Sequence, residues 1–395
     1  MTLHTKQPGA LRGNTGLIVR AARIYSGLFL LAYVTSHLIN LSLGLISIDA
    51  MDTARPYLTG VWTGPITGTL LSLSLIVHFA LGLWAIYKRP TLRTSLQDIV
   101  QLITGLLVVP LLATHAIGIA MLHDFGVDFS YNQSIRLFWL SQPTLGLVQV
   151  VMLAVVWVHG CAGLFTWLRS KESARNILGW LYPLAVAVPV IAMLGFAEAG
   201  RAVLIEARTP QVQNTYEAPR EISDETTYDQ PSTYAATPAP VVDYTLIKQV
   251  TKSVIWGSIL LAILTLLARW VRVTLIRSET VMLMRDRVGP MASTSAQTML
   301  DGFRKNNQPH ARLCEGRGRC GTCAVRILRS EFPLPPPSPL EARTLLRINA
   351  PDNARLACQL MPAGGRVETA PMYPSDYSFQ DDKPADLETQ SEVAT

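Results

Sequence analysis

The chain has 395 residues, of which 49% are hydrophobic and only 16% are charged, and its mean hydropathy is +0.27. These values exclude an ordinary soluble globular protein and indicate a membrane protein. The formal net charge is +6, but the basic residues lie beside apolar runs instead of forming one patch, which argues against nucleic-acid binding. The lipid bilayer is therefore the first partner that the sequence predicts.

Six stretches are long and apolar enough to cross a bilayer, which takes about 20 residues each. The first follows sixteen polar residues, lacks a small-residue cleavage site and is too long for a signal-peptide core, so we expect a retained helix. The sixth is the weakest, because Lys248 and Lys252 lie in its first turns. The predicted spans are residues 17–46, 62–87, 98–122, 144–168, 177–203 and 245–268.

The loops between the spans predict the orientation. Basic residues precede the first span and follow the second, fourth and sixth, which places those sides in the cytoplasm, whereas the opposite loops are acidic. The longest of these, 205–243, is too poor in apolar residues to fold alone, so we expect a flexible external loop. We expect a multi-pass protein of the bacterial inner (plasma) membrane with a cytoplasmic N-terminus. No internal repeat is evident.

Four of the seven histidines lie in the first four spans, one in each: His37, His78, His115 and His159. Ionisable side chains inside a membrane indicate function, although a single buried histidine is as often a hydrogen-bonded packing residue as a ligand. The rise of about 1.5 Å per residue and the alternating helix directions place His37 and His115 in the outer half, and His78 and His159 in the inner half. Two level pairs suit two bis-histidine haems.

Glycines near these histidines support a haem site. Gly82, Gly118 and Gly163 follow their histidines by three or four residues on the same helix face, and Gly44 lies two turns after His37. They leave room for a haem, although glycines also allow membrane helices to pack closely. The chain has no C-x-x-C-H motif for covalent attachment, so the haems are expected to be b-type.

Four of the five cysteines form one set near the end of the chain. Cys314, Cys320 and Cys323 lie in LCEGRGRCGTCAV (313–325) with the spacing C-x5-C-x2-C, and Cys358 follows after 34 residues. This is close to the plant-type ferredoxin pattern with one residue added to the first loop, and it predicts thiolate ligands for a [2Fe-2S] cluster.

Zinc and disulfides are the alternatives. A zinc ribbon normally has two C-x2-C motifs and this chain has one, and disulfides need an oxidising compartment, whereas the predicted topology is cytoplasmic. The fifth cysteine, Cys161, is more typical of a small packing residue.

This segment resembles [2Fe-2S] ferredoxins with the longer first loop of the vertebrate and bacterial type, over roughly residues 271–371. The resemblance implies an α+β domain with the β-grasp fold. The preceding residues, 1–270, form the predicted all-α bundle of six transmembrane helices, so the fold class is a multi-domain membrane protein. Residues 372–395 are acidic and expected to be disordered.

The six-span region resembles the di-haem cytochrome b anchors of succinate dehydrogenase and fumarate reductase, which share the pairing of alternate helices. Together with RLCEGRGRCGTC (312–323), it resembles the N-terminal redox module of membrane-bound bacterial adenylyl cyclases. Only about 24 residues follow the ferredoxin-like segment, too few for a cyclase catalytic domain. No cyclase activity is expected of this chain.

Arginines lie close to both predicted sites. Arg20 and Arg23, at the inner end of the first span, are candidates for pairing with haem propionates or for cytoplasmic anchoring. Arg312, Arg317, Arg319 and Arg326, around the cysteines, are candidates for tuning the cluster potential, for docking an acidic partner or for a solvated basic surface.

The leading hypothesis is membrane electron transfer between quinone or quinol, two b haems and a cytoplasmic [2Fe-2S] cluster, with a soluble cytoplasmic redox or signalling partner. No acid-base or nucleophilic set of residues stands out, so no catalytic side chain is assigned. The second hypothesis is a redox-sensing regulatory module whose cluster state is read by another protein. A third is an anchor without cofactors.

Overall fold

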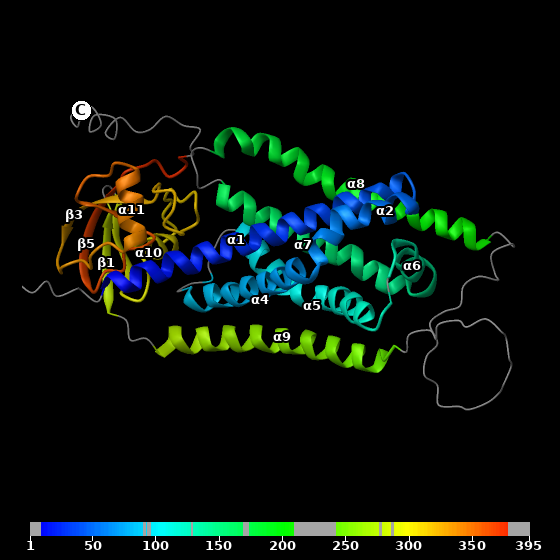
Figure 1. The fold of residues 1–395 in the computed structure, drawn as a ribbon. Coiled ribbons are helices and arrows are strands. Elements are labelled where there is room, and N and C mark those ends of the chain that lie inside the picture. Colours follow the sequence, from blue (N-terminus) through cyan, green and yellow to red (C-terminus); the bar gives the residue numbers. More distant parts are fainter. Residues whose placement is uncertain are drawn as a thin grey trace, which may run out of the picture.

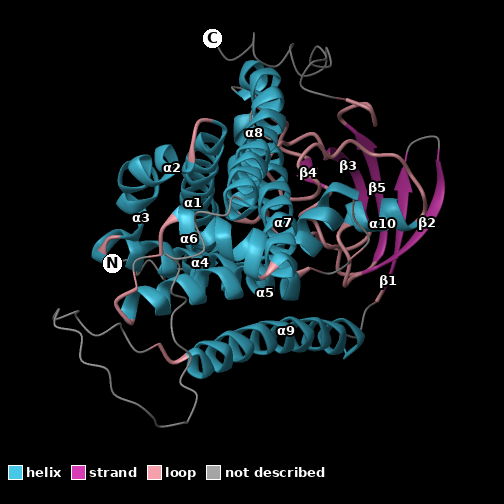
Figure 2. Cartoon of the chain, turned by 90° about the vertical axis from the view of Figure 1, so that its right-hand side faces the viewer, coloured by secondary structure: helices cyan, strands magenta, loops and turns pink. Residues whose placement is uncertain are grey.

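The computed structural model describes residues 9–89, 92, 96–127, 129–168, 174–208, 242–275, 279–285 and 288–377. The predicted external loop and the predicted acidic tail lie largely outside these described residues. Two regions make up the described chain, a bundle of long helices and a small domain with a mixed sheet (Figures 1 and 2).

Six helices are long and apolar enough to cross a membrane, so the predicted number of spans is confirmed for length and composition. The sixth, expected to be the weakest, is a 32-residue helix with Lys248 and Lys252 in its first third. The six are α1 (Gly9–Ser42), α4 (Pro65–Lys88), α5 (Leu96–Asp124), α7 (Pro143–Leu168), α8 (Arg175–Arg208) and α9 (Tyr244–Leu275).

Four of the long helices form a ring, in which α1 packs on α4, α4 on α5, α5 on α7 and α7 on α1. The other two flank it: α8 packs against α1 and α7, and α9 against α4 and α5 (Figure 1). Large apolar side chains point outward, for example Ile66 and Trp180, which are 77% and 79% exposed. An apolar exterior of this kind suits lipid contact.

Short elements lie between the long helices at the end of the bundle far from the sheet. They are η1 (Leu43–Leu45), α2 (Ile48–Arg55), η2 (Pro56–Gly60), α3 (Val61–Thr63), α6 (Tyr131–Arg136) and η3 (Leu137–Ser141). The carboxylate of Asp52 on α2 accepts from the backbone N–H groups of Tyr131 and Asn132, at 2.7 and 3.3 Å. A carboxylate at a helix N-terminus is favourable, so this contact ties the two connections together.

The C-terminal domain is a five-stranded sheet with the order β2-β1-β5-β3-β4. Strands β1 and β5 run parallel, and the other neighbours are antiparallel. This mixed sheet agrees with the ferredoxin-type fold that the resemblance implies. Its elements are β1 (Thr280–Arg285), β2 (Val288–Thr294), α10 (Met299–Lys305), β3 (Ala324–Ser330), α11 (Pro339–Arg347), β4 (Ala354–Leu356) and β5 (Gly365–Pro371).

The core of this domain lies under the sheet. Val281 and Leu283 alternate with more exposed residues along β1 and pack with Phe303 of α10, as expected for a half-buried strand. The core extends past the predicted boundary at residue 371, because Met372, Tyr373 and Tyr377 are 9%, 6% and 6% exposed and belong to it. The prediction of disorder from residue 372 is therefore wrong for residues 372–377.

The sheet domain lies at the end of the bundle where α1 begins and α9 ends (Figure 1). Helix α1 contacts α11, and Arg269 of α9 donates to the carbonyl of Arg89, at 3.0 Å, beyond the end of α4. The loop that carries Cys314, Cys320 and Cys323 faces the bundle, where its Arg317 contacts Asp98 of α5.

Candidate functional site

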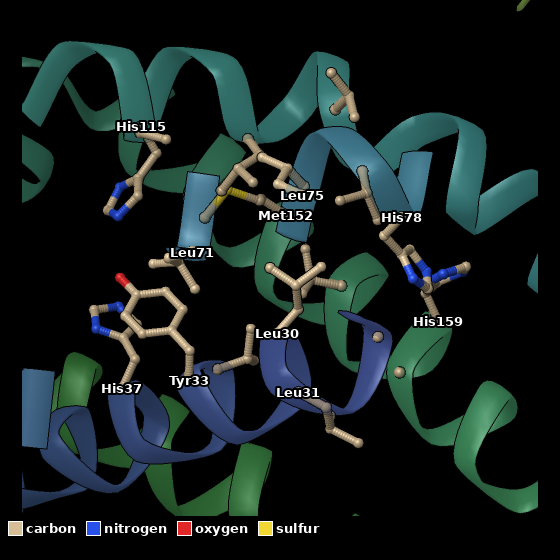
Figure 3. A pocket seen from close by; sticks show the side chains of 18 of the residues that line it. Leu30, Leu31, Tyr33, His37, Leu71, Leu75, His78, His115, Met152 and His159 are labelled. Carbon is tan, nitrogen blue, oxygen red and sulfur yellow. The ribbon is translucent and has the colours of Figure 1, made fainter. Parts of the chain in front are cut away.

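The structure brings the four span histidines together in two pairs across the diagonals of the four-helix ring. His37 of α1 and His115 of α5 have ring centroids 6.1 Å apart, and so do His78 of α4 and His159 of α7. Figure 3 shows the two pairs at opposite ends of one pocket. We call His78/His159 the inner pair, since it lies toward the sheet domain, and His37/His115 the outer pair.

The spacing within each pair suits one metal ion bound from both sides. Two imidazoles on opposite sides of a metal, each with a metal–nitrogen bond of about 2 Å, have ring centres about 6 Å apart. Their role as ligands stays a prediction. Gly27 of α1 lies beside His78 of the inner pair, and His37 of the outer pair follows it by ten residues. The two pairs are therefore about 15 Å apart along α1.

A cavity of about 1070 Å³ contains all four histidines in its lining. Its size exceeds the roughly 300–1,000 Å³ of a pocket for one small ligand. Leu30, Leu71, Leu75 and Met152 lie between the two pairs, so the centre of the cavity is apolar (Figure 3).

The inner histidines have matching hydrogen bonds to neighbouring helices. The Nδ1 of His78 lies 3.0 Å from the backbone carbonyl of Arg23, and the Nδ1 of His159 lies 3.0 Å from that of Gln101. A carbonyl oxygen only accepts, so each Nδ1 carries the proton and each Nε2 is left as a free acceptor or ligand. Ser26 and Thr104 hydroxyls lie 3.3 and 3.4 Å from the same Nδ1 atoms.

Two glycines let these rings approach the facing helices. A Cβ added to Gly27 would lie 2.6 Å from Cε1 of His78, and one added to Gly105 would lie 2.6 Å from Cε1 of His159. Both distances are too short for non-bonded carbon atoms. Sequence analysis missed both glycines because they lie on helices other than those that carry the rings.

The matching contacts disclose an internal repeat, so the sequence-based conclusion that none is evident was wrong. RIYSG (23–27) and QLITG (101–105) are each followed by a histidine ten residues after the glycine. VHFALGL (77–83) and VHGCAGL (158–164) likewise match. Helices α1 and α4 thus correspond to α5 and α7, a relation that a comparison of the first two spans with the next two could have found.

The space beside the four glycines that the sequence singled out differs from one glycine to the next. Side-chain space beside Gly82 and Gly118 is open, since an added Cβ meets no atom within 4 Å. At Gly163 an added Cβ would lie 3.0 Å from Nε2 of Gln101. Gly44 was wrongly assigned to a haem site: an added Cβ there would lie 2.3 Å from the carbonyl oxygen of Gly195, so it permits close packing of α8.

The four cysteines of the C-terminal domain come together in two pairs. Cys314, Cys320 and Cys323 lie in the loop before β3, Cys358 follows β4, and none is more than 5% exposed. The Sγ atoms of Cys323 and Cys358 are 3.2 Å apart, and the backbone N–H of Cys314 donates to Sγ of Cys320 at 3.4 Å.

The arrangement of the four thiols argues against both alternatives, a disulfide and a zinc site. All four cysteines are free thiols, and 3.2 Å is well beyond the about 2.05 Å of a disulfide. Among the described residues, no three His, Cys, Asp or Glu side chains converge on one ion position, as a zinc site requires. Two pairs of thiols fit a centre with two metal ions better than a centre with one.

Backbone groups of the cysteine loop point at the sulfurs. The N–H of Arg319 donates to Sγ of Cys314 at 3.4 Å. A hydrogen bond from the Cys320 thiol, assisted by such backbone donors, lowers the pKa of Cys314 to about 5 despite its burial. Gly316, Gly318 and Gly321 have φ values of 83°, 63° and 85°, which turn the chain around the sulfurs and favour glycine.

The cysteine loop contacts the helix that faces the inner histidines. Arg317, between the first two cysteines, donates to Oδ1 of Asp98 at 2.5 Å and to Oε1 of Gln101 at 3.3 Å. The backbone carbonyl of the same Gln101 accepts from His159. Arg317 and Arg319 also line the cavity, so the cysteine loop closes its inner end.

Residues 291–363 match the family model of the 2Fe-2S iron-sulfur cluster binding domain. Comparison with curated proteins and with solved structures gives no match. The C-terminal domain is therefore of the 2Fe-2S ferredoxin type, which supports iron-sulfur electron transfer, on a chain whose N-terminal region has six helices of membrane-spanning length.

Proposed function

We propose that the chain transfers electrons through a membrane, between quinone or quinol, two b-type haems held by the histidine pairs, and a [2Fe-2S] cluster held by Cys314, Cys320, Cys323 and Cys358. The observation that carries the proposal is one cavity with a histidine pair near each end and the cysteine loop of a ferredoxin domain across its inner end. Electron transfer across a membrane requires cofactors at successive depths, and these three sites follow one another along the cavity.

The residues present fit haem b. Each pair offers two imidazoles that would hold one haem iron between them, and the inner pair is held in the tautomer that leaves Nε2 free. Gly82 lines this cavity, and the space beside it is open. When bound, each haem iron supplies a one-electron couple.

The cysteine loop fits the cluster. Thiolates are the ligands that iron-sulfur clusters take, ligation requires their deprotonation, and the lowered pKa of Cys314 favours it. The N–H groups directed at the sulfurs stabilise negative charge there and so raise the reduction potential.

The basic loops favour a cytoplasmic position for the ferredoxin domain. A quinone site near the outer pair and a soluble acceptor or donor at the ferredoxin domain complete the proposed pathway. The surroundings of the outer pair include two aromatic rings, Tyr33 and Tyr131, whose centroids lie 6.1 and 6.4 Å from that of His37.

The test is a redox titration of the purified full chain, followed by visible and EPR spectroscopy. The proposal expects two low-spin b haems and one [2Fe-2S] cluster per chain, and sustained quinol oxidation with an artificial acceptor. A protein without a haem spectrum would refute the haem assignment. Cofactors that equilibrate once with quinol but sustain no turnover would favour the redox-sensing alternative.

A further inference from the structure

Four arginines gather at the inner end of the cavity. Arg23 of α1 and Arg89, beyond α4, come from the bundle, and Arg317 and Arg319 come from the cysteine loop. All four line the cavity, and contacts connect two of them to the inner histidines: the Arg23 carbonyl accepts from His78, and Arg317 donates to Gln101, whose carbonyl accepts from His159.

One carboxylate lies among them in the cavity lining at this end. Asp98 is 3% exposed and pairs with Arg317 at 2.5 Å and with Arg89 at 3.8 Å. Among the described residues, Arg23 and Arg319 have no carboxylate within ion-pair distance. Four positive charges and one negative charge give these five side chains a net charge of +3; the thiolates that would hold the cluster lie in the same loop and add negative charge beside Arg319.

Among the described residues at this end of the cavity, Arg319 is the clearest case of a guanidinium group without a carboxylate partner. The buried Nε of Arg319 has no hydrogen-bond partner. Elsewhere on the same domain arginines do have a carboxylate partner, since Arg304 and Arg312 share Glu315 at 3.0 and 3.2 Å. Guanidinium groups that line a cavity without a carboxylate partner favour an anion there.

We propose that Arg23, Arg89, Arg317 and Arg319 form an anion site for the two propionate carboxylates of the inner haem. The ferredoxin domain then completes the haem site with two side chains of its cysteine loop. This inference rests on the proposed function, because it needs a haem between His78 and His159. Guanidinium groups bind carboxylates through paired N–H donors, and two carboxylates reduce the net charge from +3 to +1.

The test compares haem b with its dimethyl ester, which has the same iron and ring but no carboxylates. Haem-depleted full-length protein with His37→Ala and His115→Ala, which removes both outer ligands, is titrated with each compound, and the Soret band reports binding. We expect the ester to bind at least tenfold more weakly than the acid. With Arg319→Gln or Arg23→Gln this ratio falls, whereas Arg343→Gln, an exposed arginine of the same domain, leaves it unchanged.

A second measurement does not depend on emptying the outer site. In otherwise unaltered protein, Arg319→Gln and Arg23→Gln are expected to lower the midpoint potential of the inner haem, because removing a positive charge stabilises the oxidised iron. The outer haem and the Arg343→Gln control keep their potentials. Equal binding of acid and ester, or an unchanged inner potential, would overturn the anion site while leaving the two haems in place. Absence of any haem binding would instead overturn the proposed function as well.

Discussion

Each inner histidine is fixed by one hydrogen bond and one glycine of a neighbouring helix. His78 donates to the Arg23 carbonyl and lies against Gly27, and His159 donates to the Gln101 carbonyl and lies against Gly105. The hydrogen bond sets the tautomer, and the glycine sets how closely the ring approaches. The orientation of the inner pair therefore depends on the backbone of neighbouring helices.

A methyl group at Gly27 should displace His78. In Gly27→Ala the added carbon would lie 2.6 Å from Cε1, so the ring must move, and we expect loss of most of the low-spin signal of the inner haem. Gly257→Ala, where an added Cβ meets no atom within 4 Å on α9, is the control. Visible spectra of both variants check this; an unchanged spectrum for Gly27→Ala would show that the close approach does not position the ring.

Replacing single cysteines tests whether the four thiols bind the cluster. Cys320→Ser replaces one buried thiol of the first pair by a poor ligand for iron, and the EPR signal of the reduced cluster should be abolished. Cys161→Ser, on α7 among the packed residues of the bundle, should retain the signal in full. A Cys320→Ser protein with wild-type cluster content, or one tightly bound zinc per chain, would contradict the ligand assignment.

The cysteines and histidines could be selected as candidates from the sequence because their chemistry is unusual for their surroundings. Thiols at ferredoxin spacing and imidazoles inside apolar spans are visible without a structure. Gly27 and Gly105 were not, since their importance depends on which face of one helix meets a side chain of another. Gly44 was misassigned for the same reason, because its neighbour is the backbone of α8.

At the scale of elements, α11 is held to the sheet by a buried ion pair. The guanidinium of Arg355 on β4 donates to both carboxylate oxygens of Glu341 at 2.8 and 3.1 Å, and the N–H of Leu356 donates to the same group at 2.9 Å. Glu341 is 1% exposed. The pair therefore fixes α11, whose Thr344 hydroxyl donates to the carbonyl of Gly318 in the cysteine loop at 2.7 Å.

Breaking this pair should destabilise the ferredoxin domain. Glu341→Ala leaves the Arg355 guanidinium buried without its carboxylate, which costs about 3–5 kcal/mol. Thermal loss of the cluster absorbance should occur at a clearly lower temperature. Asp352→Ala, at an exposed site of the same domain, should leave the transition within error of wild type; equal transitions in the two variants would mean that the pair contributes little.

The helices of the bundle were predictable and the order of the strands was not. Hydropathy alone located six spans, because a membrane helix must be apolar over its whole length. The order β2-β1-β5-β3-β4 pairs strands that are about 80 residues apart, and short strands carry no sequence signal for their partners. Resemblance to ferredoxins implied only the β-grasp fold.

At the scale of the whole molecule, the ferredoxin domain is docked on the bundle through the loop that carries its cysteines. Arg317 extends from that loop to Asp98 and Gln101 of α5, and Gln101 in turn binds His159. The predicted cluster and the inner histidine pair are thus connected through two side chains and one backbone carbonyl. Docking at this place could not be predicted, since it depends on the tertiary position of both domains.

Removing the carboxylate at the interface should loosen the docking. Asp98→Asn leaves Arg317 and Arg89 without their shared carboxylate, so residues 314–320 should exchange amide hydrogen faster, by tenfold or more. Hydrogen exchange followed by mass spectrometry measures this, with Asp352→Asn as control. Unchanged exchange in this loop would show that the ion pair does not hold the domain.

The measurement that tests the account most directly is the visible and EPR spectrum of four single variants, His37→Ala, His115→Ala, His78→Ala and His159→Ala. Each haem is assigned two ligands from helices that are diagonal in the ring, so removing either should alter the same haem and leave the other low-spin. The account predicts two matching spectra for His37 and His115, and two different matching spectra for His78 and His159. Matching spectra for His37→Ala and His78→Ala, or four spectra identical to wild type, would contradict it.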